Sequence, residues 1–330
     1  MIAFDHLWLL ALALILDALV GDPPLVWRTV PHPVAWIGGL IGFLDSGLNR
    51  PSASPRMRRI LGMLALVLVA AIAATAGWTL EWLLLSLRHG WIGIAVIASI
   101  FLAGRSLFDH VHDVRRAFAA GGLPAARKSV SRIVGRDPAS LDEAGVCRAA
   151  IESTAENFSD GVVAPALWFA LLGLPGMLAY KAINTADSMI GHLTPRYVDF
   201  GRAAAKADDL VNLPASRLSG LLIALAAPLA RGSAGRALAV VKADARKHRS
   251  PNAGWPEAAM AGALGIALAG PRRYRGVLVD DPFLNAGCRR RATPDDIGRA
   301  LRIYLGAAAI LFLIVVAASA PAIIETVRRW

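Results

Sequence analysis

The stretch from Glu152 to Gly191 decides how this chain can fold. It begins Glu152-Ser-Thr-Ala-Glu156-Asn157-Phe-Ser-Asp160-Gly161, continues as an apolar run, and ends Tyr180-Lys181-Ala-Ile-Asn184-Thr185-Ala-Asp187-Ser188-Met-Ile-Gly191. Glu152 and Glu156 are four residues apart and share a face if the segment is helical. Like charges beside membrane sequence repel and are costly to desolvate, and a bound metal cation would remove both costs. The alternative is an ordinary pair of solvated helix faces.

The apolar run between these two polar clusters is broken by helix-disrupting residues. They are Pro165, Gly173, Pro175 and Gly176. A straight crossing would place Glu156 and Asp187 on opposite membrane faces, about 30 Å apart. If both clusters form one site, the run from 162 to 180 must be a re-entrant or broken hairpin covered by protein or water.

The composition indicates an integral membrane protein. The chain has 330 residues, of which 56% are hydrophobic, and the excess lies in runs. The net charge of +11 is spread between these runs rather than gathered in one basic domain, and no recognition motif accompanies it, so we expect no nucleic-acid partner. Two cysteines, Cys147 and Cys288, without a CxxC motif exclude a disulfide framework and a cysteine-rich zinc site.

The remaining apolar runs predict an all-α, polytopic membrane protein. It has short, broken or re-entrant helices and cytoplasmic helical loops. We expect membrane helices over 2–20, 60–80 and 303–324, shorter apolar segments over 34–44, 91–104 and 218–230, and a small-residue helix over 258–269. No internal boundary is evident, so residues 1–330 are expected to form one domain. Arginine and lysine place loops 21–59, 105–160 and 231–302 in the cytoplasm.

The polar segments, taken in order, resemble the CobD/CbiB family of cobalamin biosynthesis. The resemblance rests on Asp17-x-x-x-Gly21-Asp22-Pro23, His32-Pro33-Val34, Val134-Gly135-Arg136-Asp137, Arg148-Ala-Ala-Ile-Glu152, Ala155-Glu156-Asn157-x-x-Asp160-Gly161, Tyr180-Lys181-Ala-Ile-Asn184-Thr185-x-Asp187-Ser188-Met189, Asp208-Asp209-x-x-Asn212, Pro214-Ala215-x-Arg217 and Ser250-Pro251-Asn252-x-Gly254. Each motif alone is weak, whereas the ordered set is highly specific and covers nearly the whole chain.

The resemblance implies an adenosylcobinamide-phosphate synthase, an acid–amine ligase. Such an enzyme joins (R)-1-amino-2-propanol, or its O-2-phosphate, to the free propionate carboxylate of adenosylcobyric acid. The family is expected to use ATP as co-substrate and Mg²⁺, with an acyl phosphate that the amine attacks. The corrinoid is then a substrate rather than a cofactor. The resemblance also implies a multi-pass protein of the bacterial inner membrane whose active site faces the cytoplasm. Candidate partners are membrane lipid, other membrane enzymes of late cobalamin assembly and a second copy of the chain.

This chemistry suits the residues of the motifs. Carboxylates that suit Mg²⁺ are Glu152, Glu156, Asp160, Asp187, Asp208 and Asp209. Candidate catalytic residues are His32, Lys181, Glu156 and Asp187. Candidates for binding substrate or phosphate are Asp22, Arg136, Asn157, Asn184, Ser188, Asn212, Arg217, Ser250 and Asn252. Among them, Lys181, Arg136 and Arg217 can neutralise phosphate charge. His32 can accept a proton from the attacking ammonium, or it is simply a loop histidine.

Two other classes use similar residues. An intramembrane prenyltransferase-like enzyme would hold Mg²⁺-diphosphate on aspartates, but should show spaced Asp-x-x-x-Asp pairs. A transporter would use the broken 162–180 segment as a gate, but should show two related halves. Here the acids of the motifs are accompanied by Asn-Thr and Ser-Pro-Asn turns instead, and two related halves are not found. Only the synthase would consume a corrinoid carboxylate.

Overall fold

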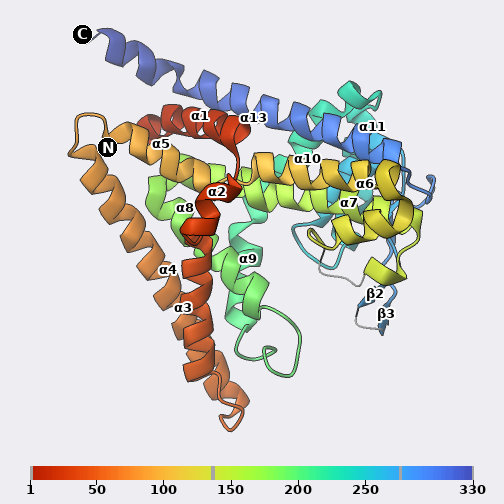
Figure 1. The fold of residues 1–330 in the computed structure, drawn as a ribbon, viewed down its shortest axis with the longest axis horizontal. Coiled ribbons are helices and arrows are strands. Elements are labelled where there is room, and N and C mark those ends of the chain that lie inside the picture. The colour runs from red at the N-terminus through yellow and green to blue at the C-terminus, as the bar shows by residue number, and fades with distance from the viewer. Residues whose placement is uncertain (1–2, 135–137, 275–276, 329–330) are drawn as a thin grey trace. The chain divides into compact units, whose positions relative to one another are not determined.

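The computed structural model describes residues 3–134, 138–274 and 277–328, and most of them are helical (Figure 1). The α-helices are α1 (Ala3–Val20), α2 (Pro24–Thr29), α3 (Pro33–Leu48), α4 (Pro55–Leu85), α5 (Gly90–Phe101), α6 (Gly104–Val130), α7 (Glu143–Phe158), α8 (Ala164–Ile190), α9 (Arg202–Val211), α10 (Leu213–Ala226), α11 (Ala234–Asp244), α12 (Gly254–Leu264) and α13 (Pro294–Arg328). Short 3-10 turns are η1 (Pro138–Ser140), η3 (Ala227–Ala230) and η4 (Ala245–Lys247), and η2 (Ser159–Val163) is a π-helical turn.

The chain is organised in two compact units. The first consists of Met1–Ala103, Ala164–Asn212 and Val315–Trp330, and the second of Gly104–Val163 and Leu213–Ile314. Each unit is therefore assembled from stretches of chain that lie far apart in the sequence.

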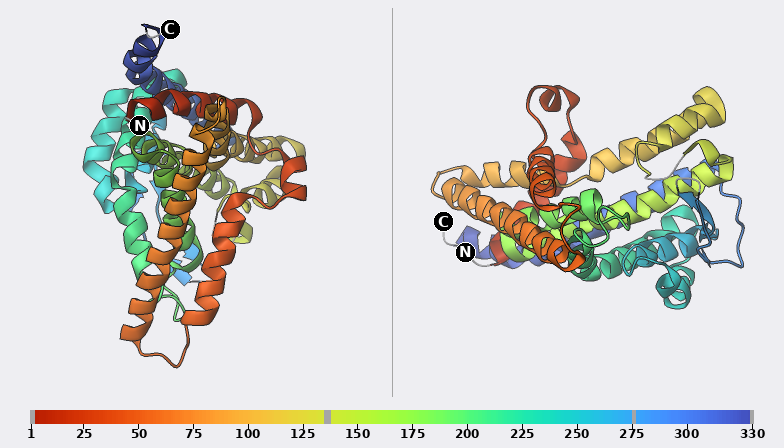
Figure 2. Two further views of the ribbon diagram at one scale, coloured as in Figure 1. Left: turned by 90° about the vertical axis from the view of Figure 1, so that its left-hand side faces the viewer. Right: turned by 90° about the horizontal axis from the view of Figure 1, so that it is seen from below.

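Helix α4 is the central element of the first unit. It has 31 residues, so it is about 46 Å long and can cross a bilayer with some tilt. Helices α3, α5, α8 and α9 pack against it. Two glycines permit close approach: a Cβ at Gly77 would lie 2.7 Å from the Leu174 backbone, and one at Gly62 would lie 1.9 Å from the carbonyl oxygen of Phe200. Figure 2 shows α3 and α4 diverging from their connecting loop.

Helix α8 is sharply kinked rather than continuous. Gly173 has φ +68°, which breaks the helix into arms over 164–172 and 174–190. A Cβ added to Gly176 would lie 2.6 Å from the carbonyl oxygen of Trp168, although eight helical residues span about 12 Å. The second arm therefore departs sharply from the direction of the first. The predicted break in this run is confirmed, whereas its folding back to bring the two polar clusters together stays a prediction.

A buried acid stabilises this break. One carboxylate oxygen of Glu81 accepts the N–H of Leu174 at 2.8 Å, and the other lies 2.9 Å from Nε2 of His6. The first N–H groups of a helix have no partner within it, so Glu81 supplies what the second arm lacks. A Cβ at Gly173 would lie 2.3 Å from the Glu81 carboxylate, which is a second reason for glycine there.

The second unit packs α10, α11 and α12 together and sets α6 alongside α7 (Figure 1). Helix α12 is buried almost throughout and consists largely of small residues, which permits this close packing. Four short strands form two antiparallel pairs: β1 (Leu268–Ala269) with β4 (Phe283–Leu284), and β2 (Arg272–Tyr274) with β3 (Val277–Val279).

The predicted helix over 258–269 is wrong at its C-terminal end. Helix α12 ends at Leu264 because Gly265 adopts φ +68°, a left-handed conformation that terminates helices. Leu268 and Ala269 then pair with β4. The tertiary pairing overrides the helical preference of the small residues.

Among the described residues, five helical stretches are long and apolar enough to cross a membrane. They are Pro55–Leu85, Gly90–Val130, Glu143–Ile190, Leu213–Ala230 and Pro294–Ala320. The all-α, multi-pass membrane fold predicted from the sequence is therefore confirmed. The third stretch includes the kink in α8 at Gly173, so the distance between its ends is shorter than that of a straight helix with the same number of residues.

Candidate functional site

The predicted site residues divide between the two units. The first unit holds Asp22, His32, Lys181, Asn184, Asp187, Ser188, Asp208, Asp209 and Asn212, and the second holds Glu152, Glu156, Asn157, Asp160, Arg217, Ser250 and Asn252. Arg136 lies outside the described residues. Because Glu156 and Asp187 belong to different units, their sharing of one Mg²⁺ stays a prediction.

The first unit brings α9 against the second arm of α8, and this creates an acidic group of Asp187, Asp208 and Asp209. The Asn184 side-chain amide donates to Oδ1 of Asp208 at 3.1 Å. Burial raises the pKa of Asp208 to about 6; the negative charge of Asp187 acts in the same direction, and the Asn184 hydrogen bond opposes it. Burial also raises the pKa of Asp209. Burial therefore disfavours the ionised form of these two carboxyl groups.

Neighbouring contacts fix the acidic group in place. The Tyr180 hydroxyl donates to Oδ1 of Asn212 at 2.9 Å. Asn212 also caps the end of α9, because its backbone N–H donates to the backbone oxygen of Asp208 at 3.1 Å. The Ser188 hydroxyl donates to the backbone oxygen of Asn184 at 2.9 Å. The Tyr180–Asn212 and Asn184–Asp208 bonds tie the second arm of α8 to α9, so the carboxylates are held by helices rather than by a mobile loop.

The acidic group cannot by itself complete a metal site. Within the described residues of either unit, no three histidine, cysteine, aspartate or glutamate side chains are close enough to hold an ion. Mg²⁺ usually keeps several waters and takes one or two carboxylates together with substrate phosphates. The arrangement fits that mode of binding and does not fit a metal held by protein ligands alone.

His32 is the N-cap of α3. Its Nδ1 accepts the backbone N–H of Val34 at 3.2 Å, and Nε2 lies 3.8 Å from the carboxylate of Asp22. Since Nδ1 is the acceptor, the neutral ring carries its proton on Nε2. Burial lowers the pKa of His32; Asp22 opposes this effect, and the positive charge of Lys181 adds to it. A neutral ring that carries its proton on Nε2 can donate to an anionic oxygen there, but it cannot accept a proton at that nitrogen.

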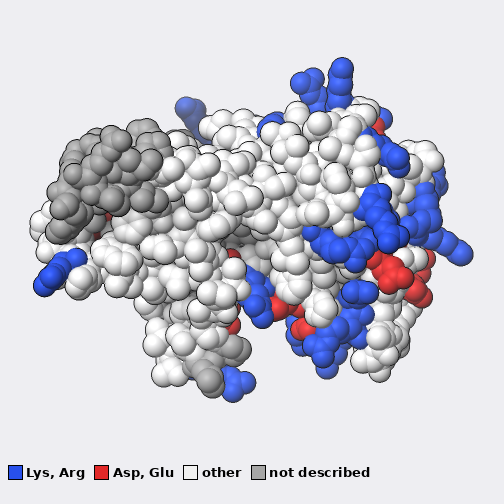
Figure 3. Space-filling model, turned by 90° about the horizontal axis from the view of Figure 1, so that it is seen from above, with Lys and Arg blue, Asp and Glu red and all other residues white. Residues whose placement is uncertain are grey.

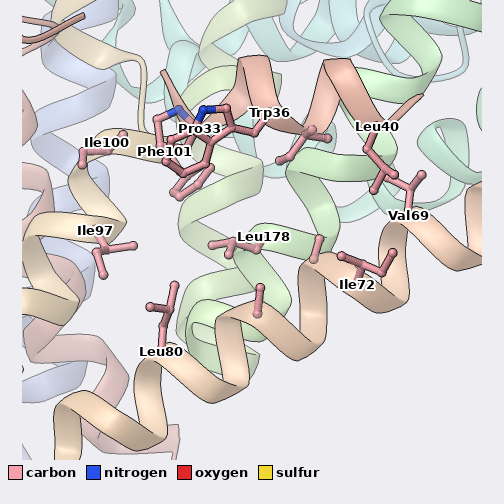
Figure 4. Close-up of a pocket in the computed structure, with 13 residues that line it drawn as sticks. Pro33, Trp36, Leu40, Val69, Ile72, Leu80, Ile97, Ile100, Phe101 and Leu178 are labelled. Carbon is pink, nitrogen blue, oxygen red and sulfur yellow. The ribbon is translucent and has the colours of Figure 1, made fainter. Parts of the chain in front are cut away.

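An apolar pocket of about 450 Å³ adjoins this cap (Figure 4). It lies between α3, α4, α5 and α8, and Pro33, the residue after His32, is at its edge. All thirteen lining residues are apolar or aromatic, among them Trp36, Phe101 and Leu178. Such a lining offers no partner for phosphate or carboxylate charge. The pocket is therefore unsuited to the charged part of a nucleotide.

The second unit presents one rigidly held arginine. Arg217 Nη1 donates to Oδ1 of Asn252 at 2.9 Å, and its guanidinium lies 4.5 Å from the ring centroid of Trp255. The Ser250 hydroxyl accepts the N–H groups of Asn252 and the next residue, which forms the turn that positions this loop. An arginine fixed in this way is preorganised to bind a carboxylate or phosphate.

Trp255 was not predicted as part of the site. The sequence signal was its position three residues after Asn252 of the Ser250-Pro251-Asn252 turn, and nothing local shows that it faces α10. The same holds for Ser216, whose hydroxyl also donates to Oδ1 of Asn252 at 3.1 Å. Both contacts join residues more than thirty positions apart, so spacing along a helix could not reveal them.

The acids of α7 and the π turn have different environments. Glu152 is buried, and its carboxylate accepts the N–H of Ala269 in β1 at 2.8 Å. Glu156 is exposed, and Asp160, within the π turn, is half-buried. Asn157 uses its side-chain amide to donate to the backbone oxygen of Ser153. Glu156 and Asp160 are therefore the more accessible carboxylates, whereas Glu152 has a structural contact.

Comparison with known proteins gives consistent results. The family model described as CobD/Cbib protein matches residues 10–304. Proteins called "Cobalamin biosynthesis protein CobD" are similar over almost their whole length: the one from Sinorhizobium sp is 52% identical over 308 residues, 92% of this chain and 95% of its own, and the one from Brucella suis is 52% identical over 313 residues, 94% and 96%. That from Rhodobacter capsulatus is 48% identical over 310 residues, 93% and 95%. No solved structure matches significantly.

Proposed function

Because this chain belongs to the CobD/CbiB family and is therefore an enzyme of cobalamin biosynthesis, we propose that it forms an amide bond on a corrinoid acid. The acid component is the free propionate carboxylate of adenosylcobyric acid. The amine component is (R)-1-amino-2-propanol or its O-2-phosphate. The observation that carries the proposal is the ordered set of motifs shared with the family, together with a rigid arginine and buried carboxylates that suit anionic substrates.

The reaction requires activation, since a carboxylate does not condense with an ammonium group in water. We propose that the γ-phosphoryl group of ATP passes to the propionate oxygen, giving ADP and an acyl phosphate. The amine, after losing one proton, attacks the acyl carbon, and inorganic phosphate leaves as the amide forms. The enzyme must therefore hold two negatively charged substrates and accept one proton.

The acidic group is the part of the first unit that suits Mg²⁺ bound to ATP. Asp208 is 9% exposed, and burial disfavours its charged form. A cation nearby would offset this cost, because opposite charge favours the ionised carboxylate. Asp187 is the second candidate ligand, and phosphates and water would complete the coordination. When bound, the ion would neutralise negative charge on the transferring phosphoryl group.

The cationic and donor groups are proposed to hold the phosphates and the propionate. Lys181 is near enough to His32 for its charge to lower the pKa of that ring. A lysine ammonium and the Nε2–H of His32 are both suited to phosphate oxygens. Arg217 in the second unit is the candidate for the propionate or for the phosphate of the amine, because Asn252 and Trp255 fix its guanidinium.

A direct assay tests the proposal. Purified protein is mixed with ATP, Mg²⁺, adenosylcobyric acid and either form of the amine, and the corrinoid is analysed by mass spectrometry. The expected product is heavier by the amine less one water, with one ADP per amide. ADP production independent of the corrinoid, or an unchanged corrinoid with both amines, would refute it.

Matched variants locate the acids that matter. We expect Asp208→Asn, Asp187→Asn and Glu156→Gln each to abolish amide formation and weaken the dependence on Mg²⁺. Asp113→Asn is the control, because Asp113 is an exposed acid outside both candidate groups. If Glu156→Gln retains full activity while Asp187→Asn loses it, the prediction that both acids serve one metal–ATP complex is wrong.

We further propose that the protein lies in the inner membrane with these groups facing the cytoplasm, where ATP is available. The positive-inside rule supports this orientation. Single cysteines introduced at Ser52, Ser131 and Arg249 avoid the Ser54 and Ser250 hydroxyls, which accept backbone hydrogen bonds. All three should resist a membrane-impermeant thiol reagent in intact spheroplasts. Labelling of any of them would overturn the orientation.

A further inference from the structure

A pocket lined by three arginines lies in the second unit, and neither Arg217 nor any of the acids discussed above belongs to its lining. Its lining consists of Leu229 and Ala230 from η3, Arg231, and Arg299 and Arg302 from α13, and its volume is about 570 Å³. We call it the arginine pocket. No acid lines it, so it presents a concentration of positive charge.

Two of the three guanidinium groups are available to a ligand. Arg299 donates to the backbone oxygen of Ala230 at 3.3 Å and to Asp296 at 3.2 Å, so part of its donor capacity is used. Within the described part of the chain, the guanidinium groups of Arg231 and Arg302 have no hydrogen bond or ion pair, and both residues are exposed. The pocket therefore retains two unneutralised cations whose repulsion an anion would relieve.

The pocket lies where two apolar membrane segments end. Leu213–Ala230 and Pro294–Ala320 are both candidate membrane spans, and Arg231 directly follows the first. The two segments touch at this level, because a Cβ added to Gly306 would lie 2.2 Å from the Leu229 side chain. Figure 3 shows basic side chains gathered over the part of the molecule that holds α11 and the start of α13.

Exposed leucines lead from the arginine pocket along the helices. Leu221, Leu225 and Leu229 are four residues apart, so they form one stripe along α10 and η3. Leu229 is 60% exposed and Leu305, one turn into the apolar part of α13, is 50% exposed. A ligand that contacts both regions must have an anionic head and a long apolar tail.

We propose that the arginine pocket binds the phosphate of an anionic phospholipid, whose acyl chains lie against this leucine stripe. Basic pockets between membrane helices at the cytoplasmic side are known to hold anionic head groups. A free phosphate would satisfy the arginines equally well but would leave the leucines without a role. The proposal concerns a lipid site and is independent of the amide-forming reaction.

Lipid binding measured by native mass spectrometry tests this proposal. Detergent-solubilised protein is offered dioleoyl phosphatidylglycerol or dioleoyl phosphatidylcholine, which have the same acyl chains and differ in head-group charge. We expect the wild type to retain phosphatidylglycerol preferentially. In the double variant Arg231→Gln/Arg302→Gln, its affinity should fall about 30-fold, which corresponds to about 2 kcal/mol for two charges.

Lys242→Gln is the matched control, because it removes one exposed charge of α11 outside the pocket. It should keep the preference for phosphatidylglycerol. Equal retention of the two lipids by the wild type would overturn the proposal even if the double variant failed to fold. A double variant that keeps the preference would also overturn it. Protection against thermal unfolding by millimolar inorganic phosphate, with no added effect of phosphatidylglycerol, would assign the pocket to free phosphate instead.

Discussion

Replacing Asp208 with asparagine should stabilise the ligand-free protein at neutral pH. Asp208 is buried, and its pKa is raised from 3.8 to about 6 by burial first and by Asp187 as a further cause. In the unfolded chain the same group titrates near its ordinary value. Each unit of pKa corresponds to about 1.4 kcal/mol, so the charged carboxylate costs the folded state about 3 kcal/mol at pH 7.

The pH dependence follows from the sign of this shift. Between about pH 4 and pH 6 the folded state holds a proton on Asp208 that the unfolded state has lost, so unfolding releases a proton. The contribution of this group to stability is therefore fully present below about pH 4 and is lost as the pH rises through about 6. The asparagine variant does not titrate at this position, and it can still accept the Asn184 hydrogen bond.

Thermal unfolding followed by tryptophan fluorescence in detergent provides the assay. The variant and the wild type should unfold at similar temperatures at pH 4, and the variant should be the more stable by a growing margin up to pH 7. Mg²⁺ with ATP should raise the unfolding temperature of the wild type at pH 7.5 and leave the variant unaffected. An equal pH slope for both proteins, or a less stable variant at pH 7, would refute the reasoning.

Three further substitutions test other parts of the structure. Gly173→Ala should lower the free energy of unfolding by about 3–5 kcal/mol, because the alanine is strained in the left-handed conformation and the Glu81 cap is lost. Gly42→Ala is the control: Gly42 faces open space on α3, so its substitution should not lower the temperature of thermal unfolding. His32→Asn should raise KM for a phosphate-bearing substrate about tenfold without changing the shape of the pH–rate profile between pH 6 and 8, and a lost inflection would contradict its role as donor. Arg217→Lys should lower kcat/KM about 10- to 100-fold at an unchanged unfolding temperature, because lysine cannot both stack on Trp255 and bind an anion in a fixed direction; normal turnover would exclude Arg217 from the site.

The sequence alone determined the membrane class and the break in α8. In a bilayer, a long uncharged run such as 60–80 satisfies its backbone hydrogen bonds within itself by forming a helix. This argument does not depend on which segments pack against the run. Gly173 and Pro175 likewise predict a break in the helix by themselves, because glycine readily adopts non-helical backbone angles and proline lacks a backbone N–H. The ordered motifs also sufficed to predict the family, because each is a local string of residues.

Only the tertiary structure decided which carboxylates are buried and what they contact. Helical spacing put Glu152 and Glu156 in one group, yet β1 takes the Glu152 carboxylate and leaves Glu156 exposed. Spacing equally gave no reason to pair Asn184 with Asp208, or to bring Glu81 to the break at Gly173. Desolvation and hydrogen bonding act through space, so the protonation of an acid depends on segments that the local sequence does not contain.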